Sequence, residues 1–207
     1  MQIDRRHVKF TDSYGSALTV ISLALSLSGC IPSFSTYYAP RSELGRVERE
    51  GPCSMDIRRT ILLPLAADAE VDVRAFRYPN NSAPILVSVA YWIGPGHIAQ
   101  LVDTAVTVRE KDNLIPFVYE IKELGKGIAP TPATRQTAQE LMRGEGPSVA
   151  DIYARRTPYT FSFNLLFENP EEFTLVLPAT MIDGRRIEAT AVTFTRKRSM
   201  HVTAICF

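Results

Sequence analysis

The sequence predicts an all-β protein, an antiparallel immunoglobulin-like β-sandwich with a small helical insertion. Beyond residue 53, apolar and polar side chains alternate with a period of two, which is typical of strands that bury one face. Turn-forming residues separate these segments, and no regularly alternating helices stand between them. Together these features favour two antiparallel sheets around one core over a parallel sheet.

About nine strands are expected from this alternation. The clearest one covers 159–167, where an aromatic or leucine side chain occupies every second position. Further strands are expected at 57–65, 71–78, 85–93, 101–109, 115–121 and 173–177. Asp183-Gly184 predicts a type I′ hairpin turn, because this pair tolerates a positive φ. Residues 196–198 are expected to form the turn between the last two strands.

One segment does not follow the period of two. Thr131-Pro132 is followed by good helix formers and by Gly144, which is the order of a capped helix with proline in its first turn. With a second short helix at 149–155, it would form an insertion at about 131–156. Covering an open sheet edge is the simplest role for such an insertion, and partner recognition is the alternative.

The N-terminus has a different pattern. Arg5, Arg6 and Lys9 precede an uncharged run at 16–29, which is shorter than the roughly 20 residues of a transmembrane helix and is typical of an export signal. The run ends in Leu27-Ser28-Gly29-Cys30, which resembles the lipobox of bacterial lipoproteins at all four positions. The paired arginines resemble a twin-arginine export signal, but Lys9 occupies a position where that signal prefers an apolar residue. An ordinary basic head is therefore expected, and the twin-arginine route is the alternative.

The resemblance implies cleavage between Gly29 and Cys30, a diacylglyceryl group on Cys30 Sγ and acylation of the new amino group. Two or three acyl chains hold a protein stably on a membrane. Ile31 stands where an Asp would imply retention at the inner membrane, so the resemblance implies the outer membrane, facing the periplasm, in a Gram-negative cell. The alternative for Cys30 is an ordinary buried cysteine.

These features divide the chain into a signal peptide at 1–29, a lipidated N-terminus and flexible tether at 30–52, and a β-sandwich domain at 53–207. The tether is expected because 31–51 has prolines, serines and mixed charges without a sustained apolar period. Assigning Cys30 to lipid leaves Cys53 and Cys206 as a candidate disulfide in an oxidising compartment. Such a long loop would add about 5 kcal/mol of stability. Two free thiols are the alternative.

The sequence offers no catalytic constellation, metal site or cofactor site. His97 and His201 are too few for the usual zinc sites, and His97 follows the turn Gly94-Pro95-Gly96, where an exposed loop imidazole is expected. Serine-elbow and H-E-x-x-H motifs are absent from the sequence. The near balance of 23 basic and 22 acidic residues leaves no marked basic excess, so no nucleic-acid partner is expected.

Two further features bear on binding. Trp92 shares a strand face with Leu86 and Ala90, opposite the inward set, and belongs either to a binding patch or to packing under the insertion. Arginine doublets such as Arg155-Arg156 suit carboxylate or phosphate groups, although a general composition bias would produce them as well.

The function expected from the sequence is therefore that of a membrane-anchored lipoprotein with a non-catalytic interaction or envelope accessory domain. Its expected partners are the lipid bilayer, through acylated Cys30, and an envelope protein. One alternative is an immunity-type inhibitor of a secreted toxin or periplasmic hydrolase. The competing class is an envelope hydrolase that uses scattered carboxylates.

Overall fold

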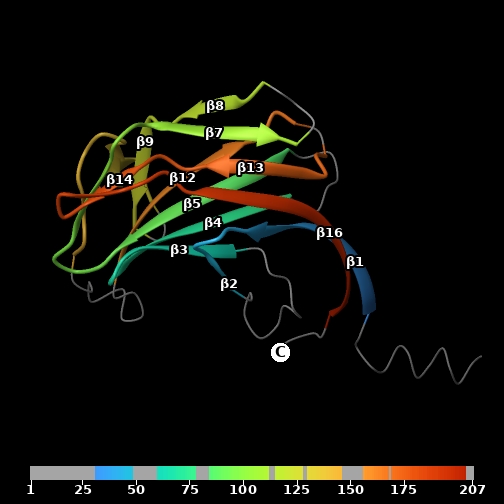
Figure 1. Ribbon diagram of the computed structural model, residues 1–207. Helices are drawn as coiled ribbons and strands as arrows, with labels where there is room; N and C mark the ends of the chain where they lie inside the picture. Colours follow the sequence, from blue (N-terminus) through green and yellow to red (C-terminus); the bar gives the residue numbers. More distant parts are fainter. Residues whose placement is uncertain are drawn as a thin grey trace, which may run out of the picture.

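The structure is a computed structural model of the 207-residue chain and describes residues 31–48, 60–77, 84–111, 115–127, 130–145, 156–167 and 169–203. These residues form strands in three antiparallel sheets, which confirms the all-β class (Figure 1). Cys30, Cys53, Cys206 and the expected signal peptide lie outside the described residues, as do the expected helix at 149–155 and residues 49–52 of the expected tether.

Each sheet has a simple antiparallel order. The five-stranded sheet contains, in spatial order, β1 (Ile31–Arg41), β16 (Ala191–Thr203), β13 (Glu172–Val176), β7 (Ala105–Glu110) and β8 (Phe117–Glu120). The seven-stranded sheet contains β10 (Arg135–Thr137), β9 (Glu123–Lys126), β12 (Thr157–Asn164), β5 (Ile85–Ile93), β4 (Ala69–Arg77), β3 (Thr60–Ala66) and β2 (Arg46–Glu48). The four-stranded sheet contains β11 (Met142–Arg143), β6 (Ile98–Leu101), β14 (Thr180–Ile182) and β15 (Arg185–Ile187).

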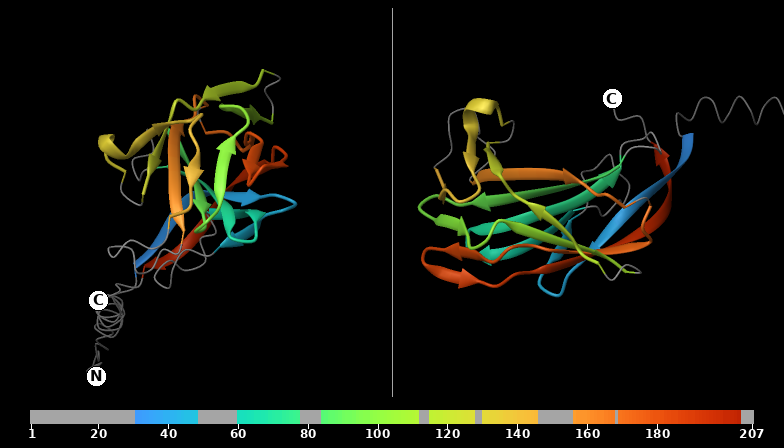
Figure 2. Two further views of the ribbon diagram at one scale, coloured as in Figure 1. Left: turned by 90° about the vertical axis from the view of Figure 1, so that its left-hand side faces the viewer. Right: turned by 90° about the horizontal axis from the view of Figure 1, so that it is seen from above.

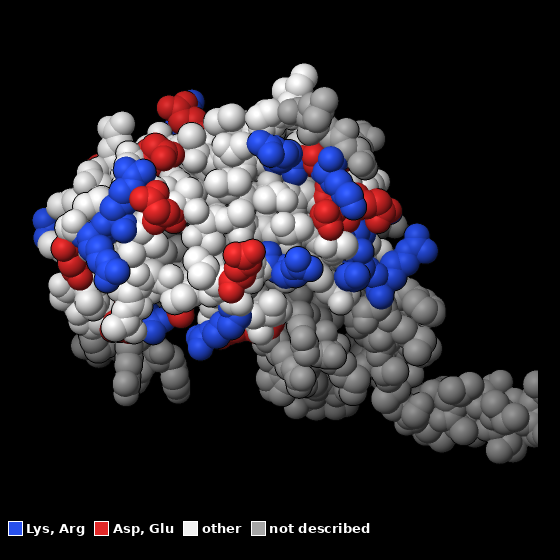
Figure 3. All heavy atoms as spheres, viewed as in Figure 1, with Lys and Arg blue, Asp and Glu red and all other residues white. Residues whose placement is uncertain are grey.

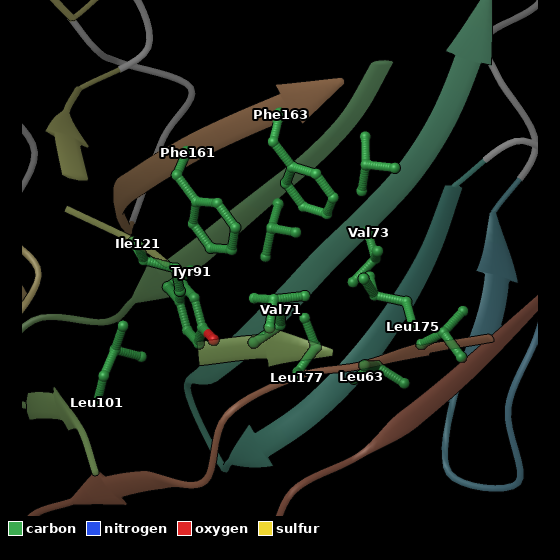
Figure 4. Packing of buried hydrophobic residues seen from close by; sticks show 14 of the residues in the cluster. Leu63, Val71, Val73, Tyr91, Leu101, Ile121, Phe161, Phe163, Leu175 and Leu177 are labelled. Atoms are coloured by element: carbon green, nitrogen blue, oxygen red, sulfur yellow. The ribbon is translucent and has the colours of Figure 1, made fainter. Parts of the chain in front are cut away.

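One hydrophobic core lies between the five-stranded and seven-stranded sheets and receives side chains from both (Figure 4). In β4, Val71 and Val73 are buried in this core, and the alternate residue Asp72 lies on the outer face of the seven-stranded sheet. The same alternation places Phe161 and Phe163 of β12 inside. The alternation of apolar and polar residues in the sequence thus gives these strands one apolar face and one polar face.

Aromatic rings join the strands on the two sides of this core. Tyr119 of β8 stacks on Phe163 of β12, with 4.4 Å between ring centroids. Within the five-stranded sheet, Phe173 lies 5.0 Å from Phe194 and 5.4 Å from Tyr38, measured between ring centroids. Phe173 therefore links β13, β16 and β1, which are far apart in the sequence.

The strands β1 and β16 form a long two-stranded ribbon, and this corrects the prediction of a flexible tether. Their register runs from Ile31 opposite Thr203 to Arg41 opposite Thr193. Strand β16 pairs with β13 as far as Thr195, and beyond Arg196 its strand partner among the described residues is β1. The expected turn at 196–198 is likewise wrong, because β1 provides the backbone partners that carry β16 straight through this segment.

The ribbon gives the molecule two distinct ends. Its tip, where Ile31 and Thr203 pair, lies at one end of the molecule. The β3–β4 turn and the β14–β15 hairpin lie at the opposite end (Figures 1 and 2). The two paired positions near the ends of the chain are therefore adjacent in space.

The predicted helix at 131–144 is wrong. The segment forms a single 3-10 turn, Pro132–Thr134, followed by the short strands β10 and β11. Threonine side chains compete with helical backbone bonds here, since the Thr137 hydroxyl donates to Glu140 Oε1 (2.9 Å) and the Thr134 hydroxyl donates to the Thr131 carbonyl (3.1 Å). The Thr137 N–H also donates to Glu140 Oε1 (3.0 Å). Part of this segment therefore extends the seven-stranded sheet, because β10 pairs with β9 at its edge.

The predicted hairpin at Asp183-Gly184 is confirmed. Asp183 and Gly184 connect β14 to β15 with φ values of 50° and 79°, as a type I′ turn requires. The space around Gly184 is open, since an added Cβ would have no atom within 4 Å.

This turn allows a small and specific effect to be predicted. Gly184→Ala should lower the free energy of unfolding by about 1 kcal/mol, because alanine resists a positive φ. Gly184→Asn should cost less, since asparagine tolerates that conformation. Urea denaturation of the three proteins measures the difference, and equal stability of the Ala and Asn variants would show that backbone conformation does not limit this turn.

Candidate functional site

A groove on the outer side of the seven-stranded sheet is the most promising candidate site. It has a volume of about 330 Å³ and lies beside the β3–β4 turn. Its lining is apolar except for three charged side chains. The apolar part comes from Leu44, Gly45, Leu62, Pro64, Ala66, Ala67 and Ala69, and the charged part comes from Arg46, Glu70 and Arg156. Ligand sites commonly combine an apolar lining with a few convergent polar groups in this way.

The charged residues of the groove form a chain of ion pairs. Arg156 is held firmly, with Nη1 2.5 Å from Glu70 Oε1 and Nε donating to Asp68 Oδ1 at 2.7 Å. Arg46 is held loosely, with Nη2 3.6 Å from both Glu70 Oε2 and Glu48 Oε1. The side chain of Arg46 is 70% exposed, whereas that of Arg156 is 29% exposed. One arginine is therefore fixed, and the other is able to turn toward a ligand.

The backbone explains why these residues meet. Glu70 occupies an outward position of β4, directly opposite Pro64 of β3 and Trp92 of β5. Arg46 lies in β2 opposite Leu62. Arg156 immediately precedes β12 and reaches the β3–β4 turn through Asp68. Strands β2 and β4, the β3–β4 turn and the residue just before β12 thus contribute to one charged cluster.

Asp72, next to this groove, is a largely buried carboxyl group whose surroundings disfavour its charged form. It is opposite Leu62 and Ala90, both buried, and its Oδ1 has no hydrogen-bond partner in the described part of the chain. Burial raises the pKa of Asp72 to about 6, against the opposing effect of Arg74, and Glu48 and Glu70 raise it further. Carboxyls with raised pKa values concentrate at functional sites, so Asp72 supports the choice of this region.

The structure places Trp92 at the border of this region. Its side chain is half-buried on the outer face, in register with Glu70 and with Pro158 of β12. The sequence analysis identified Trp92 and the Arg155-Arg156 doublet but missed Arg46 and Glu70. Nothing in the sequence marks these two, because outward charged residues on strands are ordinary.

His97 and Asp183 form a second polar contact, at the end of the molecule opposite the ribbon tip. His97 Nδ1 donates to Asp183 Oδ2 (2.6 Å), and the Ile98 N–H donates to Asp183 Oδ1 (2.9 Å). The hydrogen bond from His97, followed by that from Ile98, lowers the pKa of Asp183. His97 lies in the loop after β5, as expected, but its side chain is only 29% exposed and is paired with Asp183.

This pair connects two segments of the chain. It fastens the turn that follows β5 to the β14–β15 hairpin, and the backbone bond from the Asp183 N–H to the Ile98 carbonyl (2.9 Å) strengthens the junction. No nucleophilic side chain of the described residues hydrogen-bonds to the other ring nitrogen of His97. His201 lies in β16 opposite Ser33, far along the ribbon, so the two histidines are not brought together.

Charge is distributed unevenly over the face that contains the ribbon and the five-stranded sheet. Basic and acidic side chains form groups toward both ends, and further acidic and basic side chains lie in the lower middle of this face (Figure 3). Within the described ranges, no group of three or more His, Cys, Asp or Glu side chains is placed to hold a metal ion. The same residues contain no helix long and apolar enough to cross a membrane.

Fold and groove together define an all-β protein with a surface groove of mixed apolar and charged lining. No model of a known protein family matches the chain, and no curated protein or solved structure shows significant similarity to it.

Proposed function

We propose that this protein is a lipid-anchored lipoprotein of the bacterial envelope, attached through acylated Cys30, and that its domain is a non-catalytic interaction module. In this proposal the two large sheets form an immunoglobulin-like sandwich, the outer membrane is the site of attachment, and the groove is the binding surface for an envelope protein. The lipobox resemblance at Leu27-Ser28-Gly29-Cys30 supports the anchor.

The observation that carries this proposal is the position of Ile31. It is the residue directly after Cys30, and it lies at the tip of the β1–β16 ribbon at one end of the molecule. An acyl group attached one residue earlier would extend from this end of the molecule. The β3–β4 turn and the groove beside it would then point away from the membrane.

Charge and apolar exposure support the groove as the binding surface. Leu44 is 67% exposed at its margin, and Arg46 beside it is only loosely paired. Neither the toxin-inhibitor alternative nor the hydrolase alternative is favoured by a particular contact among the described residues. The carboxylate that lines the groove, Glu70, is paired with two arginines rather than with a second acid.

Lipid attachment is tested by labelling with a radioactive fatty acid in the producing bacterium. The wild-type protein should be labelled and shortened by residues 1–29, because acylation and cleavage depend on the same cysteine. Cys30→Ala should lose the label and keep the full length. Cys206→Ala is the matched control and should behave as the wild type, and a label that persists in Cys30→Ala would contradict the anchor.

A further inference from the structure

We propose that one buried water molecule is an integral part of this fold, bound between the hydroxyl groups of Tyr91 and Thr180. Tyr91 belongs to β5 of the seven-stranded sheet and Thr180 to β14 of the four-stranded sheet, so the water joins the two sheets. The site shares no lining residue with the groove. It is therefore independent of the proposed anchor and of the proposed partner.

The Tyr91 hydroxyl is a polar group inside the hydrophobic core. The residue is 1% exposed, and its Oη has no hydrogen-bond partner among the described residues. Burial raises the pKa of Tyr91, and the neighbouring Thr180 hydroxyl opposes that rise, which places the two hydroxyls close together without a completed hydrogen bond. A buried hydroxyl without a partner destabilises a fold, so this group requires one that the surrounding side chains do not provide.

Thr180 and Pro178 provide further polar atoms with unused hydrogen-bonding capacity. The Thr180 residue is 2% exposed, and its hydroxyl donates to the Pro178 carbonyl at 3.5 Å. That distance is well beyond the 2.7 to 2.8 Å that is typical, as a rough value, of O–H···O bonds. The Thr180 oxygen and the Pro178 carbonyl also keep acceptor lone pairs. With the Tyr91 hydroxyl they make three partners, about the number that a buried water usually has.

A small cavity lies against these three groups, and its size identifies the occupant. Its volume is about 10 Å³, which is roughly the space that one water molecule needs and is too small for any larger ligand. In Figure 4 the Tyr91 hydroxyl points toward Val71 and Leu177, two apolar residues of the cavity wall. The exposed residue Glu188 also lines the cavity, so the site lies near enough to the surface for water to enter.

A crystal structure of the full-length chain at about 1.5 Å resolution tests the proposal directly. We expect an ordered water oxygen at hydrogen-bond distance, about 2.5 to 3.2 Å, from Tyr91 Oη and Thr180 Oγ1. The Pro178 carbonyl oxygen should accept a hydrogen bond from the same water. A direct hydrogen bond between the two hydroxyls, with no electron density in the cavity, would overturn the proposal.

Tyr91→Phe provides a second test in solution, because the sign of its effect depends on the water. If the water is bound, this variant should unfold at a lower urea concentration than the wild type, since it removes one of the water's partners. Tyr159→Phe is the matched control and should also lower the midpoint. The Tyr159 hydroxyl donates to the Arg143 carbonyl (2.9 Å) and accepts from the Arg143 N–H (2.9 Å).

The opposite result has an equally clear meaning. A hydroxyl that is buried without any partner carries a desolvation penalty, and its removal relieves that penalty. A midpoint of Tyr91→Phe equal to or above that of the wild type, with Tyr159→Phe lowered, would therefore show that no water satisfies Tyr91.

Discussion

Asp72→Asn is expected to stabilise the protein at pH 8 by about 2 to 3 kcal/mol and to have little effect at pH 4. In the folded protein burial raises the pKa of the Asp72 carboxyl to about 6 from 3.8. The folded state then holds its proton more tightly than the unfolded chain does. The contribution of Asp72 to the free energy of unfolding is complete below pH 4. It is lost as the pH rises through about 6, because the carboxyl group must then ionise beside Leu62 and Ala90.

Urea denaturation of the two proteins at several pH values measures this effect. Glu70→Gln is the matched control, because Glu70 is two residues away on the same face but is paired with Arg156 and Arg46. That variant should lose stability at neutral pH rather than gain it. A constant difference between Asp72→Asn and wild type from pH 4 to pH 8 would show that Asp72 does not titrate in this range.

Phe173→Ala is expected to lower the free energy of unfolding by about 3 to 5 kcal/mol at every pH. Phe173 is fully buried and contacts the rings of Phe194 and Tyr38, so its removal leaves a cavity where three strands of one sheet meet. Phe173→Leu should cost less, because it fills part of that cavity. The Tyr38 hydroxyl, which donates to the Pro170 carbonyl (3.1 Å), keeps its partner in both variants.

Circular dichroism during urea denaturation checks this expectation. Leu166→Ala serves as the control, because Leu166 is 72% exposed and its truncation should change stability by less than about 0.5 kcal/mol. If Phe173→Ala and Leu166→Ala had similar midpoints, the packing around Phe173 would not contribute to folding as described.

The elements predicted well from the sequence are those whose information is local. The strand expected at 85–93 has those bounds in β5, and the Asp183-Gly184 turn forms as expected, since alternation and turn chemistry are properties of neighbouring residues. The β1–β16 ribbon was not predicted because the strand that pairs with residues 31–41 lies far away in the sequence. Residues 31–41 have no apolar pattern of their own and become a strand only because residues 193–203 pair with them.

The helix prediction was wrong, and the groove was not predicted, for two different reasons. Between Thr131 and Gly144 the local preference for helix was overridden by threonine hydrogen bonds and by pairing of β10 with β9. The groove depends on Arg46 of β2, Glu70 of β4 and Arg156 just before β12, which all have ordinary sequence surroundings. Only the three-dimensional register brings them together, so no local pattern could have predicted the site.

The pairing of Ile31 with Thr203 has a practical consequence for anyone who places a reporter on this protein. A fluorescent protein or epitope attached directly after Thr203 would start beside Ile31, next to the position from which the acyl chain is proposed to extend. Such a fusion would crowd the bilayer and leave the groove clear. The opposite end of the molecule, at the exposed hairpin residues Asp183-Gly184, is where an inserted tag would be displayed to the surroundings.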